Sequence, residues 1–437
     1  MSQLTGRGFR PVLANRPFRL LWLAQLLALV AQHAITFVQL VLVEKLTGST
    51  VHLGLTILAF SLPGVILSPI AGVTVDRLPR KWIMVGSNLV RVFFALGYIL
   101  ILQMPAGTWQ LLSIYFITFL TSTVAQFFAP AEGATIPTLV GEQHLLAANS
   151  LFTLTLILSQ VLGLVVLGPL AISLLQIEGG FALIAAMYLG ATLLLTRLPR
   201  DIPHEHGAAN AASIWQALWA DLREALRFLS GHRRLQANLI QLLTIATIII
   251  LLAMLAPGYA ARVLGMEPEN AIIVFAPAGF GMLLATAATG RWGHVLRRIG
   301  FSHLGLALGG LAFAGLGWVS LDYHHLMQPL LAVYPQAAFS LTTMTMILGL
   351  VIGVSLAIVN ILAQTSVQQE TPSEMRGRVL SLQFVLNNLL GIPPLLGFGG
   401  LADAIGIPRV MVIIGLVTVA MGGLSLLLTH LPVSRSR

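Results

Sequence analysis

A short charged segment, Asp76 to Lys81, separates two apolar stretches that are each long enough to cross a membrane. The hydrocarbon core of a bilayer is roughly 30 Å thick, and a helix needs about 20 residues to cross it. The segment must therefore lie at a membrane face, where its charged side chains stay hydrated. Only 9% of the 437 residues are charged, against about 25% in a soluble domain. These features predict a polytopic membrane protein.

Apolar runs of this length recur along the chain and predict an all-α membrane protein with twelve transmembrane helices. The first run is too long for the core of a signal peptide, and no small-residue cleavage site follows it. We expect the helices at about 18–43, 52–75, 82–104, 109–129, 145–175, 181–196, 235–259, 271–289, 301–321, 339–367, 377–401 and 408–428.

The basic residues are distributed unevenly between the two sides of the predicted membrane. Of the 24 Lys and Arg residues, all except Lys45, Arg91, Arg262 and Arg409 fall on one face. Cytoplasmic loops carry the excess of Lys and Arg, so we expect both termini in the cytoplasm and the protein in the inner membrane of a bacterium. In a soluble chain the net charge of +9 would suggest a nucleic-acid partner; this distribution excludes one.

The second half of the chain repeats the organisation of the first. The segment Gly290 to Arg298 stands where Gly72 to Lys81 stands in the first half, with His294 in the place of Asp76. Two halves of six helices are typical of transporters that are built from structural repeats. The repeat therefore predicts two pseudo-symmetric six-helix bundles.

A shift in composition marks the boundary between these bundles. The stretch after Arg197 is polar and rich in small residues, and 213–230 has the pattern of an amphipathic helix. We expect an N-terminal bundle at 1–197, a linker at 198–234 and a C-terminal bundle at 235–437. The amphipathic helix is expected to lie in the cytoplasmic membrane interface.

The residues of the first charged segment resemble a known loop. Gly72, Asp76, Arg77, Arg80 and Lys81 follow the spacing of the loop between helices 2 and 3 in the major facilitator superfamily, although Pro79 replaces a glycine. The resemblance implies the twelve-helix fold of that family. It also implies that Asp76 latches the cytoplasmic side to the second half of the protein. A plain topogenic loop is the other interpretation.

The resemblance extends to one branch of the family. The segments Pro130 to Leu151, Asp221 to Arg234 and Gln369 to Val379 look like the enterobactin exporter and macrolide efflux proteins. Similar patterns occur in lysophospholipid transporters, so a lipid transporter or flippase is an alternative. Gly168 and Pro169 are a fragment of the antiporter pattern, whose glycine pair is missing here. The direction of transport is left open.

Polar side chains form stripes on six of the expected helices. Amides that faced lipid would be unsatisfied, so we expect the stripes to line a shared cavity, with helices 3, 6, 9 and 12 outside. Interhelical hydrogen bonding without a cavity is the alternative for any single amide. The expected cavity residues are Gln32, His33, Thr36, Gln39, Tyr115, Gln126, Gln160, Gln241, Asn360, Gln364, Gln383 and Asn387.

Arg91 is the most informative charge within a predicted helix. An arginine at a helix centre costs about 2.5–3.5 kcal/mol on insertion scales. A role as a gate or substrate contact would explain its presence, and so would a side chain that snorkels to the near membrane face. In the related branch an acid often stands three residues earlier, where this chain has Asn88.

Two further groups could titrate or pair within the bundles. Glu132 could pair with Arg376 or Arg378 at an inner gate, or it could cap a helix. His33 could carry a proton, because histidine titrates near neutral pH, or it could be a hydrogen-bonded residue of the cavity.

The sequence excludes several classes of function. A P-loop needs Gly-Lys-Ser/Thr, and the only lysines follow Glu44 and Arg80, so ATP hydrolysis is not expected. There is no cysteine and no His-Glu-x-x-His, so we expect no metal, no cofactor and no catalytic residue. The prediction is a secondary transporter, not an enzyme: a monomer that exports a small amphipathic molecule of drug or siderophore type by alternating access, coupled to protons. A non-transporting membrane sensor is the competing hypothesis.

Overall fold

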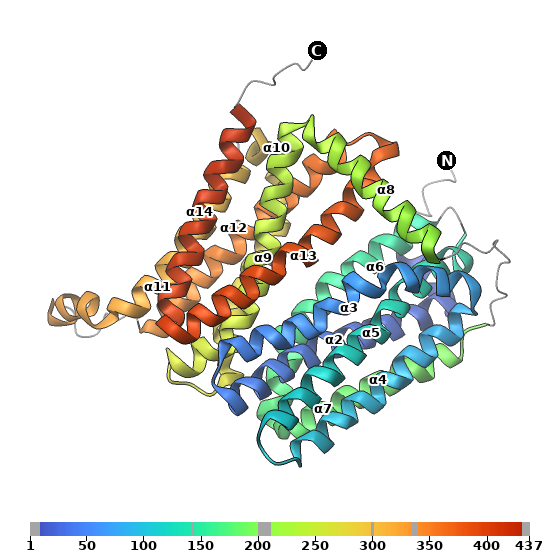
Figure 1. Cartoon of the computed structure of the whole chain (residues 1–437), viewed down its shortest axis with the longest axis horizontal. Helices are drawn as coiled ribbons and strands as arrows, with labels where there is room; N and C mark the ends of the chain where they lie inside the picture. The colour runs from blue at the N-terminus through green and yellow to red at the C-terminus, as the bar shows by residue number, and fades with distance from the viewer. Residues whose placement is uncertain (1–8, 142–143, 200–210, 299–300, 334–339, 431–437) are drawn as a thin grey trace. The chain divides into compact units, whose positions relative to one another are not determined.

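The computed structural model describes residues 9–141, 144–199, 211–298, 301–333 and 340–430, and these residues are almost entirely helical, with no strand among them. The helices (Figure 1) are α1 (Phe9–Ala14), α2 (Arg16–Thr47), α3 (Thr50–Arg77), α4 (Arg80–Leu102), α5 (Thr108–Leu139), α6 (Leu145–Gln160), the π-helical η2 (Val161–Leu167), α7 (Gly168–Thr196), α8 (Ala211–Ser230), α9 (Arg233–Arg262), the 3₁₀ turn η3 (Pro268–Ala271), α10 (Ile272–Arg298), α11 (Phe301–Val333), α12 (Leu341–Glu370), α13 (Ser373–Ile405) and α14 (Ile407–His430).

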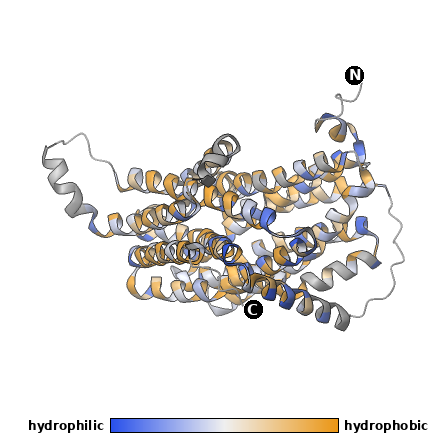
Figure 2. Cartoon of the chain, turned by 90° about the horizontal axis from the view of Figure 1, so that it is seen from above, coloured by the Kyte–Doolittle hydropathy of each residue, from blue (hydrophilic) through white to orange (hydrophobic). Residues whose placement is uncertain are grey.

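The apolar helices are long enough to cross a membrane, and apolar residues run along their whole length (Figure 2). Among the described residues there are 11 such runs, of which Ala147–Thr196 has 50 residues. One straight helix of that length would measure about 75 Å, more than twice the bilayer core. The run is broken at Gln176, where φ is 61° and ψ is −176°. It therefore holds two crossings, and the expected all-α fold with twelve crossings is confirmed.

The chain forms two compact units. Unit 1 consists of Met1–Leu46 and Leu55–Trp215, and unit 2 consists of Thr47–Gly54 and Gln216–Arg437. Helix α3 therefore begins in unit 2 and continues in unit 1.

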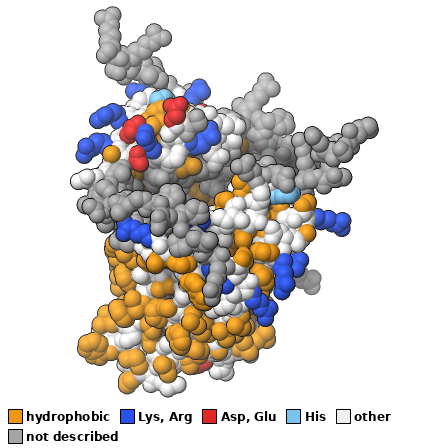
Figure 3. Space-filling model, turned by 90° about the vertical axis from the view of Figure 1, so that its right-hand side faces the viewer, with side chains coloured by type: hydrophobic (Ala, Val, Ile, Leu, Met, Phe, Trp, Pro, Cys, Tyr) orange, Lys and Arg blue, Asp and Glu red, His pale blue; other side chains and the backbone are white. Residues whose placement is uncertain are grey.

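In unit 1, α4 packs against α5 and α7. Aromatic rings fill the contact between α4 and α7: Tyr98 stacks on Phe181 with 4.6 Å between ring centroids, and both rings are fully buried. Each buried aromatic side chain removes about 150–250 Å² from solvent. Figure 3 shows one face of the molecule, on which hydrophobic side chains form a broad cover.

Unit 2 repeats the helix pairs of unit 1. Helix α11 packs against α12 and α14, as α4 packs against α5 and α7. Small residues bring these helices into backbone contact: a side chain at Gly353 of α12 would collide with the backbone of Ala278 on α10, and one at Gly415 of α14 with the backbone of α11 at Gly310. Such contacts are typical of helix pairs in membranes.

Helix α8 matches the expected amphipathic helix of the linker. Its buried residues Leu222, Ala225 and Leu229 form a stripe that packs within unit 2. The residues that complete this cluster lie on α9, α12 and α13: Leu235, Leu239, Leu242, Ala363, Val367, Val379 and Leu382. The apolar stripe is thus buried against protein, and an interfacial position remains a prediction for the rest of the helix.

Two helix ends differ from expectation. The fourth helix, expected to end near residue 129, continues as α5 through Pro130 and Pro137 to Leu139. Prolines are tolerated in membrane helices where neighbouring groups satisfy the freed carbonyls. Likewise, the ninth helix, expected to end near residue 321, continues as α11 to Val333, with a kink at Asp322. The continuation of α5 past residue 129 places Glu132 inside a helix.

Candidate functional site

The candidate site in unit 1 is built around Arg91 of α4. Its side chain is only 2% exposed, and its guanidinium carbon lies 5.5 Å from the ring centroids of Phe128 on α5 and Tyr188 on α7. Nη1 donates a hydrogen bond of 3.3 Å to Oδ1 of Asn88. An arginine between two aromatic faces gains cation–π attraction, which is strongest when the cation is desolvated.

Glu132 on α5 is the acidic counterpart of Arg91. It is also 2% exposed, and the two opposite charges interact electrostatically within unit 1. Helix α5 continues through Pro130, which brings Glu132 into the bundle and away from any turn. The structure therefore places the carboxylate in the interior of the same bundle as the arginine, near enough for the two charges to influence each other although they form no ion pair among the described residues. Arg378, one of its expected partners, instead pairs with other acids.

Several polar atoms of this cluster have no hydrogen-bond partner among the described residues. They are Nε of Arg91, Nδ2 of Asn88, the hydroxyl of Tyr188 and Oε1 of Glu132. Buried polar atoms are nearly always hydrogen-bonded to protein or to ordered water. Four such atoms around one pair of charges mark a place where a water molecule or a ligand group can bind.

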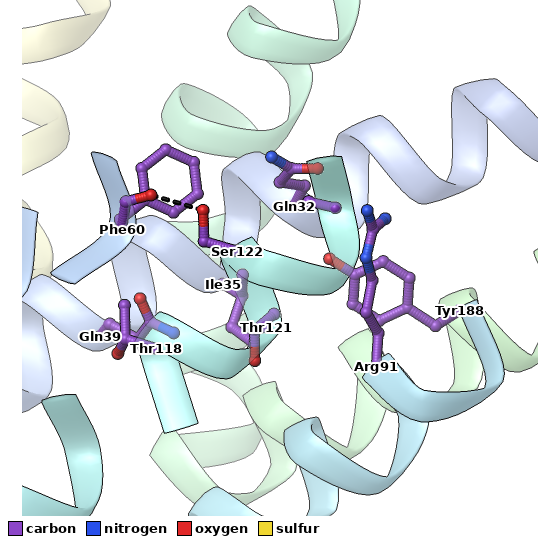
Figure 4. A pocket seen from close by; sticks show the side chains of 10 residues that line it. Gln32, Ile35, Gln39, Phe60, Arg91, Thr118, Thr121, Ser122 and Tyr188 are labelled. Carbon is purple, nitrogen blue, oxygen red and sulfur yellow. Dashed lines mark hydrogen bonds between the residues drawn. The ribbon is translucent and has the colours of Figure 1, made fainter. Parts of the chain in front are cut away.

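A small cavity adjoins the arginine (Figure 4). The cavity has a volume of about 10 Å³, which is room for one water molecule. Figure 4 shows that its walls come from α2, α3, α4, α5 and α7. The lining residues are Gln32, Ile35, Gln39, Phe60, Arg91, Thr118, Thr121, Ser122, Ala125 and Tyr188.

Hydrogen bonds hold the wall of this cavity in place. Nε2 of Gln39 donates to the hydroxyl of Tyr98 at 2.7 Å, and that hydroxyl lies 2.8 Å from Oγ1 of Thr118. On the opposite side, the hydroxyl of Ser122 donates to the backbone carbonyl of Phe60. The polar groups are therefore fixed by contacts among α2, α3, α4 and α5 before any ligand arrives, which lowers the entropic cost of binding one.

The other expected cavity residues of unit 1 do not line this cavity. The hydroxyl of Thr36 donates to the carbonyl of Gln32 at 3.0 Å, and the amide of Gln126 donates to the carbonyl of Ser122 at 3.3 Å, so both bond to their own helices. His33 and Tyr115 are half-buried, and Gln160 is exposed. The structure thus brings together Gln32 and Gln39 of the expected set.

In unit 2, two expected cavity residues bond to each other. Nε2 of Gln383 on α13 donates to Oε1 of Gln364 on α12 at 3.0 Å. Oε1 of Gln383 and Oδ1 of Asn387 are buried without a hydrogen-bond partner among the described residues, whereas Asn360 is exposed. These amides form a second polar group with unused capacity to accept hydrogen bonds.

Gln241 lies elsewhere than expected. It is fully buried, and its Nε2 lies 2.9 Å from Nδ1 of His303 on α11 and 3.1 Å from Oγ of Ser425 on α14. Helices α11 and α14 are the ninth and twelfth crossings, which were expected outside the cavity. Gln241 therefore belongs to an interhelical hydrogen-bond network, as the alternative for single amides predicted.

The basic residues of the first charged segment contact helix ends within unit 1. Nη1 of Arg80 donates to the carbonyl of Ala134 in α5 at 2.8 Å, and Nζ of Lys81 donates to the carbonyl of Leu198 just after α7 at 2.6 Å. Cations are favourable at helix C-termini, where carbonyl groups lack partners. Arg77 is exposed. Gly72 and Asp76 belong to α3, and the side chain of Asp76 lies outside what the structure describes.

The two arginines near the start of α13 make contacts within unit 2. Arg378 forms ion pairs with Asp221 at 2.9 Å and Glu224 at 2.6 Å, both on α8. Arg376 donates to the carbonyl of Thr371 at 3.4 Å. The ion pairs of Arg378 fasten α8 to α13, in the same region as the apolar stripe of α8.

Sequence reasoning missed Tyr188, because the sixth helix is otherwise almost purely apolar and one tyrosine gives no pattern. Its position on the face of α7 that packs against α4 is set by the fold. The only signal was its isolation as a polar tip among apolar residues.

Comparisons with known proteins agree with this architecture. Residues 21–394 match the family model of the Major Facilitator Superfamily. The uncharacterized MFS-type transporter YfiS of Bacillus subtilis (strain 168) is 26% identical over 392 residues, which cover 88% of this chain and 86% of the relative. The putative bacilysin exporter BacE of the same strain is 26% identical over 368 residues, with coverage of 83% and 81%. Macrolide efflux protein A of Streptococcus pyogenes is 30% identical over 131 residues, 29% of this chain and 31% of the relative.

Solved structures of transporters share the fold. The nucleoside transporter NupG superposes with a TM-score of 0.68 at 13% identity and covers 96% of this chain and 100% of its own. A bacterial homologue of the iron transporter ferroportin, in its inward-facing state, gives a TM-score of 0.66 at 14% identity, with coverage of 94% and 97%. At these identities the likeness concerns the arrangement of helices and not the substrate.

Proposed function

The chain belongs to the major facilitator superfamily of membrane transporters, and we propose that it exports a small amphipathic molecule in exchange for protons. Membership confirms the expectation of a transporter and not an enzyme. The expected resemblance to macrolide efflux proteins is confirmed as well. Export is supported by relatives that are named as a macrolide efflux protein and a putative bacilysin exporter.

The observation that carries the proposal of proton coupling is the burial of two opposite charges, Arg91 and Glu132, within one bundle. Removing two charges from water costs several kcal/mol per ion, and well-packed apolar residues would stabilise the bundle as well or better. A buried, charge-coupled carboxyl group in a polar site is a candidate for proton transfer. In the proposed cycle, Glu132 carries the proton and Arg91 responds to its charge.

Exchange requires that the proton and the substrate exclude one another. Oε1 of Glu132 has no hydrogen-bond partner among the described residues. As a carboxylate oxygen it can accept a proton or a charge-assisted hydrogen bond from a substrate donor, and a proton there removes the negative charge and turns this oxygen into a donor, which weakens the contact with the substrate. By thermodynamic linkage, the substrate then weakens proton binding by the same factor as the proton weakens substrate binding. That reciprocity is the basis of antiport.

The polar groups of the cavity favour a particular class of substrate. Gln32, Gln39, Thr121 and Ser122 present amides and hydroxyls, and the charge of Arg91 is compensated by Glu132. Such walls suit a neutral or amphipathic molecule with hydrogen-bonding groups. Drug-like and siderophore-like molecules belong to this class, and in the proposed cycle the cavity, which has room for one water molecule in this structure, widens to admit them.

The organisation of the protein in the membrane completes the proposal. Bundles 1–197 and 235–437, joined by the linker 198–234, alternately expose the site to the two sides of a bacterial inner membrane. The excess of Lys and Arg on one face supports a cytoplasmic position for both termini. The protein acts as a monomer in this proposal.

A flux experiment with purified protein tests this function. Drugs, siderophores and lysolipids are first screened by thermal shift, and the best ligand is then followed in proteoliposomes with a pH gradient or with ATP. We expect flux that follows the pH gradient and ignores ATP. Glu132→Gln should lose the response to the gradient, whereas Glu178→Gln, which changes an exposed acid of α7, should keep it.

Other outcomes would contradict parts of the proposal. Flux that ignores both the pH gradient and the membrane potential would indicate facilitated diffusion. A ligand that stabilises the protein but is not transported across the proteoliposome membrane would indicate a sensor. Transport of lysolipids alone would indicate the lipid-transporter alternative.

A further inference from the structure

The start of α3 is capped by a residue from the far end of the chain. Asp403, in the last turn of α13, accepts hydrogen bonds from the backbone N–H of Thr50 at 2.7 Å and of Val51 at 3.1 Å, and from the hydroxyl of Ser49 at 2.5 Å. The first N–H groups of a helix have no partner within it. An acidic side chain that accepts from them is the usual cap, but it normally comes from the adjacent residue.

Arg262, at the end of α9, joins this cluster. Its Nη1 lies 3.3 Å from Oδ1 of Asp403, and its Nη2 donates to the hydroxyl of Thr50 at 2.7 Å. Asp403 is therefore held by one cation and three hydrogen-bond donors. We call Ser49, Thr50, Val51, Arg262 and Asp403 the brace.

Glycines allow the backbones to meet beside the brace. A Cβ atom at Gly399 of α13 would lie 3.3 Å from the carbonyl oxygen of Thr50, and one at Gly54 of α3 would lie 3.3 Å from the carbonyl oxygen of Leu395. The first turn of α3 is thus packed against α13 as well as capped by it. For this reason Thr47–Gly54 forms part of unit 2, although the rest of α3 belongs to unit 1.

This arrangement has a mechanical consequence for alternating access. One continuous helix is fixed to unit 2 by its first turn and to unit 1 by the remainder. A change of orientation between the units must open the brace or bend α3 near Gly54. We propose that the brace opens in every transport cycle and that Asp403 is the residue that holds it closed. The proposal rests on the alternating access proposed above and adds the residue that controls one of its gates.

A cross-link across the brace gives the decisive test. The chain has no cysteine, so Val51→Cys with Gly399→Cys can form a single disulfide, since a Cβ atom at Gly399 would lie 3.4 Å from Cα of Val51. We expect the oxidised double variant to lose transport by about tenfold or more, and a reductant to restore it. The matched control is Gly309→Cys with Ser355→Cys, which joins α11 to α12 within unit 2, with 3.3 Å between the Cβ positions; it should transport in both states.

A labelling experiment tests the same idea without a transport assay. Leu53 is fully buried beside the brace, so Leu53→Cys reports opening by its reaction with a membrane-impermeant maleimide. Asp403→Ala and the milder Asp403→Asn should each speed labelling, by about tenfold for the former, because they remove charged hydrogen bonds. Asp322→Asn, which changes an acid outside the brace, should leave the rate unchanged.

Two results would overturn the proposal. One is full transport by the completely cross-linked brace variant, which would show that the brace is a permanent fastening. The other is an unchanged labelling rate in both Asp403 variants. Neither result depends on the coupling ion or on the direction of transport, so a failure of the brace is distinguishable from a failure of the proposed function.

Discussion

The guanidinium of Arg91 lies 5.5 Å from the ring centroid of Tyr188, and the hydroxyl of that ring has no hydrogen-bond partner among the described residues. The arginine is 2% exposed, so its side chain points into the bundle of unit 1 and does not reach the membrane face. Snorkelling therefore does not account for it. A cation that is kept inside a bundle needs a compensating charge, and Glu132 supplies one.

Substitution of Arg91 should separate its charge from its shape. We expect Arg91→Leu to lower transport at least about tenfold, because it leaves Glu132 as a buried charge without its partner. Arg91→Lys keeps the charge but loses the planar group that lies between two rings, so we expect partial activity. Initial rates in proteoliposomes measure both, with Arg409→Leu as a control at an exposed site. Transport by Arg91→Leu at the wild-type rate would show that the buried charge of Arg91 is not needed for transport.

The pair of Arg91 and Glu132 should show strong non-additivity in stability. Glu132→Gln alone should destabilise unit 1 by about 3–5 kcal/mol, because the arginine is left unpaired in a buried site. The double change Arg91→Met with Glu132→Gln should recover most of that loss while abolishing proton-coupled transport. Thermal unfolding of the four proteins in detergent measures the coupling. Additive losses in this cycle would show that the two charges do not interact.

The positions of most helices could be predicted from the sequence, because long apolar runs and the breaks between them are local features of the chain. The break between the fifth and sixth crossings was expected between Leu175 and Phe181, and it occurs at Gln176. The predicted end of the fourth crossing, near residue 129, was wrong. Pro130 and Pro137 would stop an isolated helix, but prolines are tolerated within a bundle.

The site was less readable than the helices. The spacing of amides shows which face of a helix is polar, but not which neighbour that face meets. Gln39 and Gln241 look alike in sequence, yet the first lines the cavity and the second bonds to His303 and Ser425. The pairing of Arg91 with Glu132 depended on α5 continuing past its first proline, which the sequence did not predict.

Gln241 should act on stability and not on substrate recognition. Gln241→Leu removes a donor that lies near both His303 and Ser425, so we expect a loss of about 1–3 kcal/mol in the free energy of unfolding. The KM for transport should stay unchanged. Gln383→Leu, which alters the pair with Gln364, is the contrasting variant and should change KM. A changed KM with unchanged stability in Gln241→Leu would contradict this structural role and indicate that Gln241 contacts the substrate.

The role of Asp76 as a cytoplasmic latch remains a prediction from the sequence. Asp76→Asn should weaken the cytoplasmic latch and impair transport several-fold, while the protein still inserts in the membrane, because one lost charge at a membrane face does not prevent insertion. Transport in proteoliposomes and the amount of protein in isolated membranes measure the two effects. Asp201→Asn, in the linker, is a control for the loss of an acid. Transport at the wild-type rate would end the latch hypothesis.

Helix α13 carries a fastening at each end. Arg378, near its start, binds α8, and Asp403, in its last turn, binds the start of α3. At 1.5 Å per residue these two residues stand roughly 38 Å apart along one rod. Pro393 and Pro394 lie between them, and each lacks the N–H that would stiffen the rod at that point. A displacement of one end of α13 therefore moves the other end only to the extent that the segment at Pro393 and Pro394 resists bending. The bending stiffness of this segment sets how strongly the movements of the two ends of α13 are coupled.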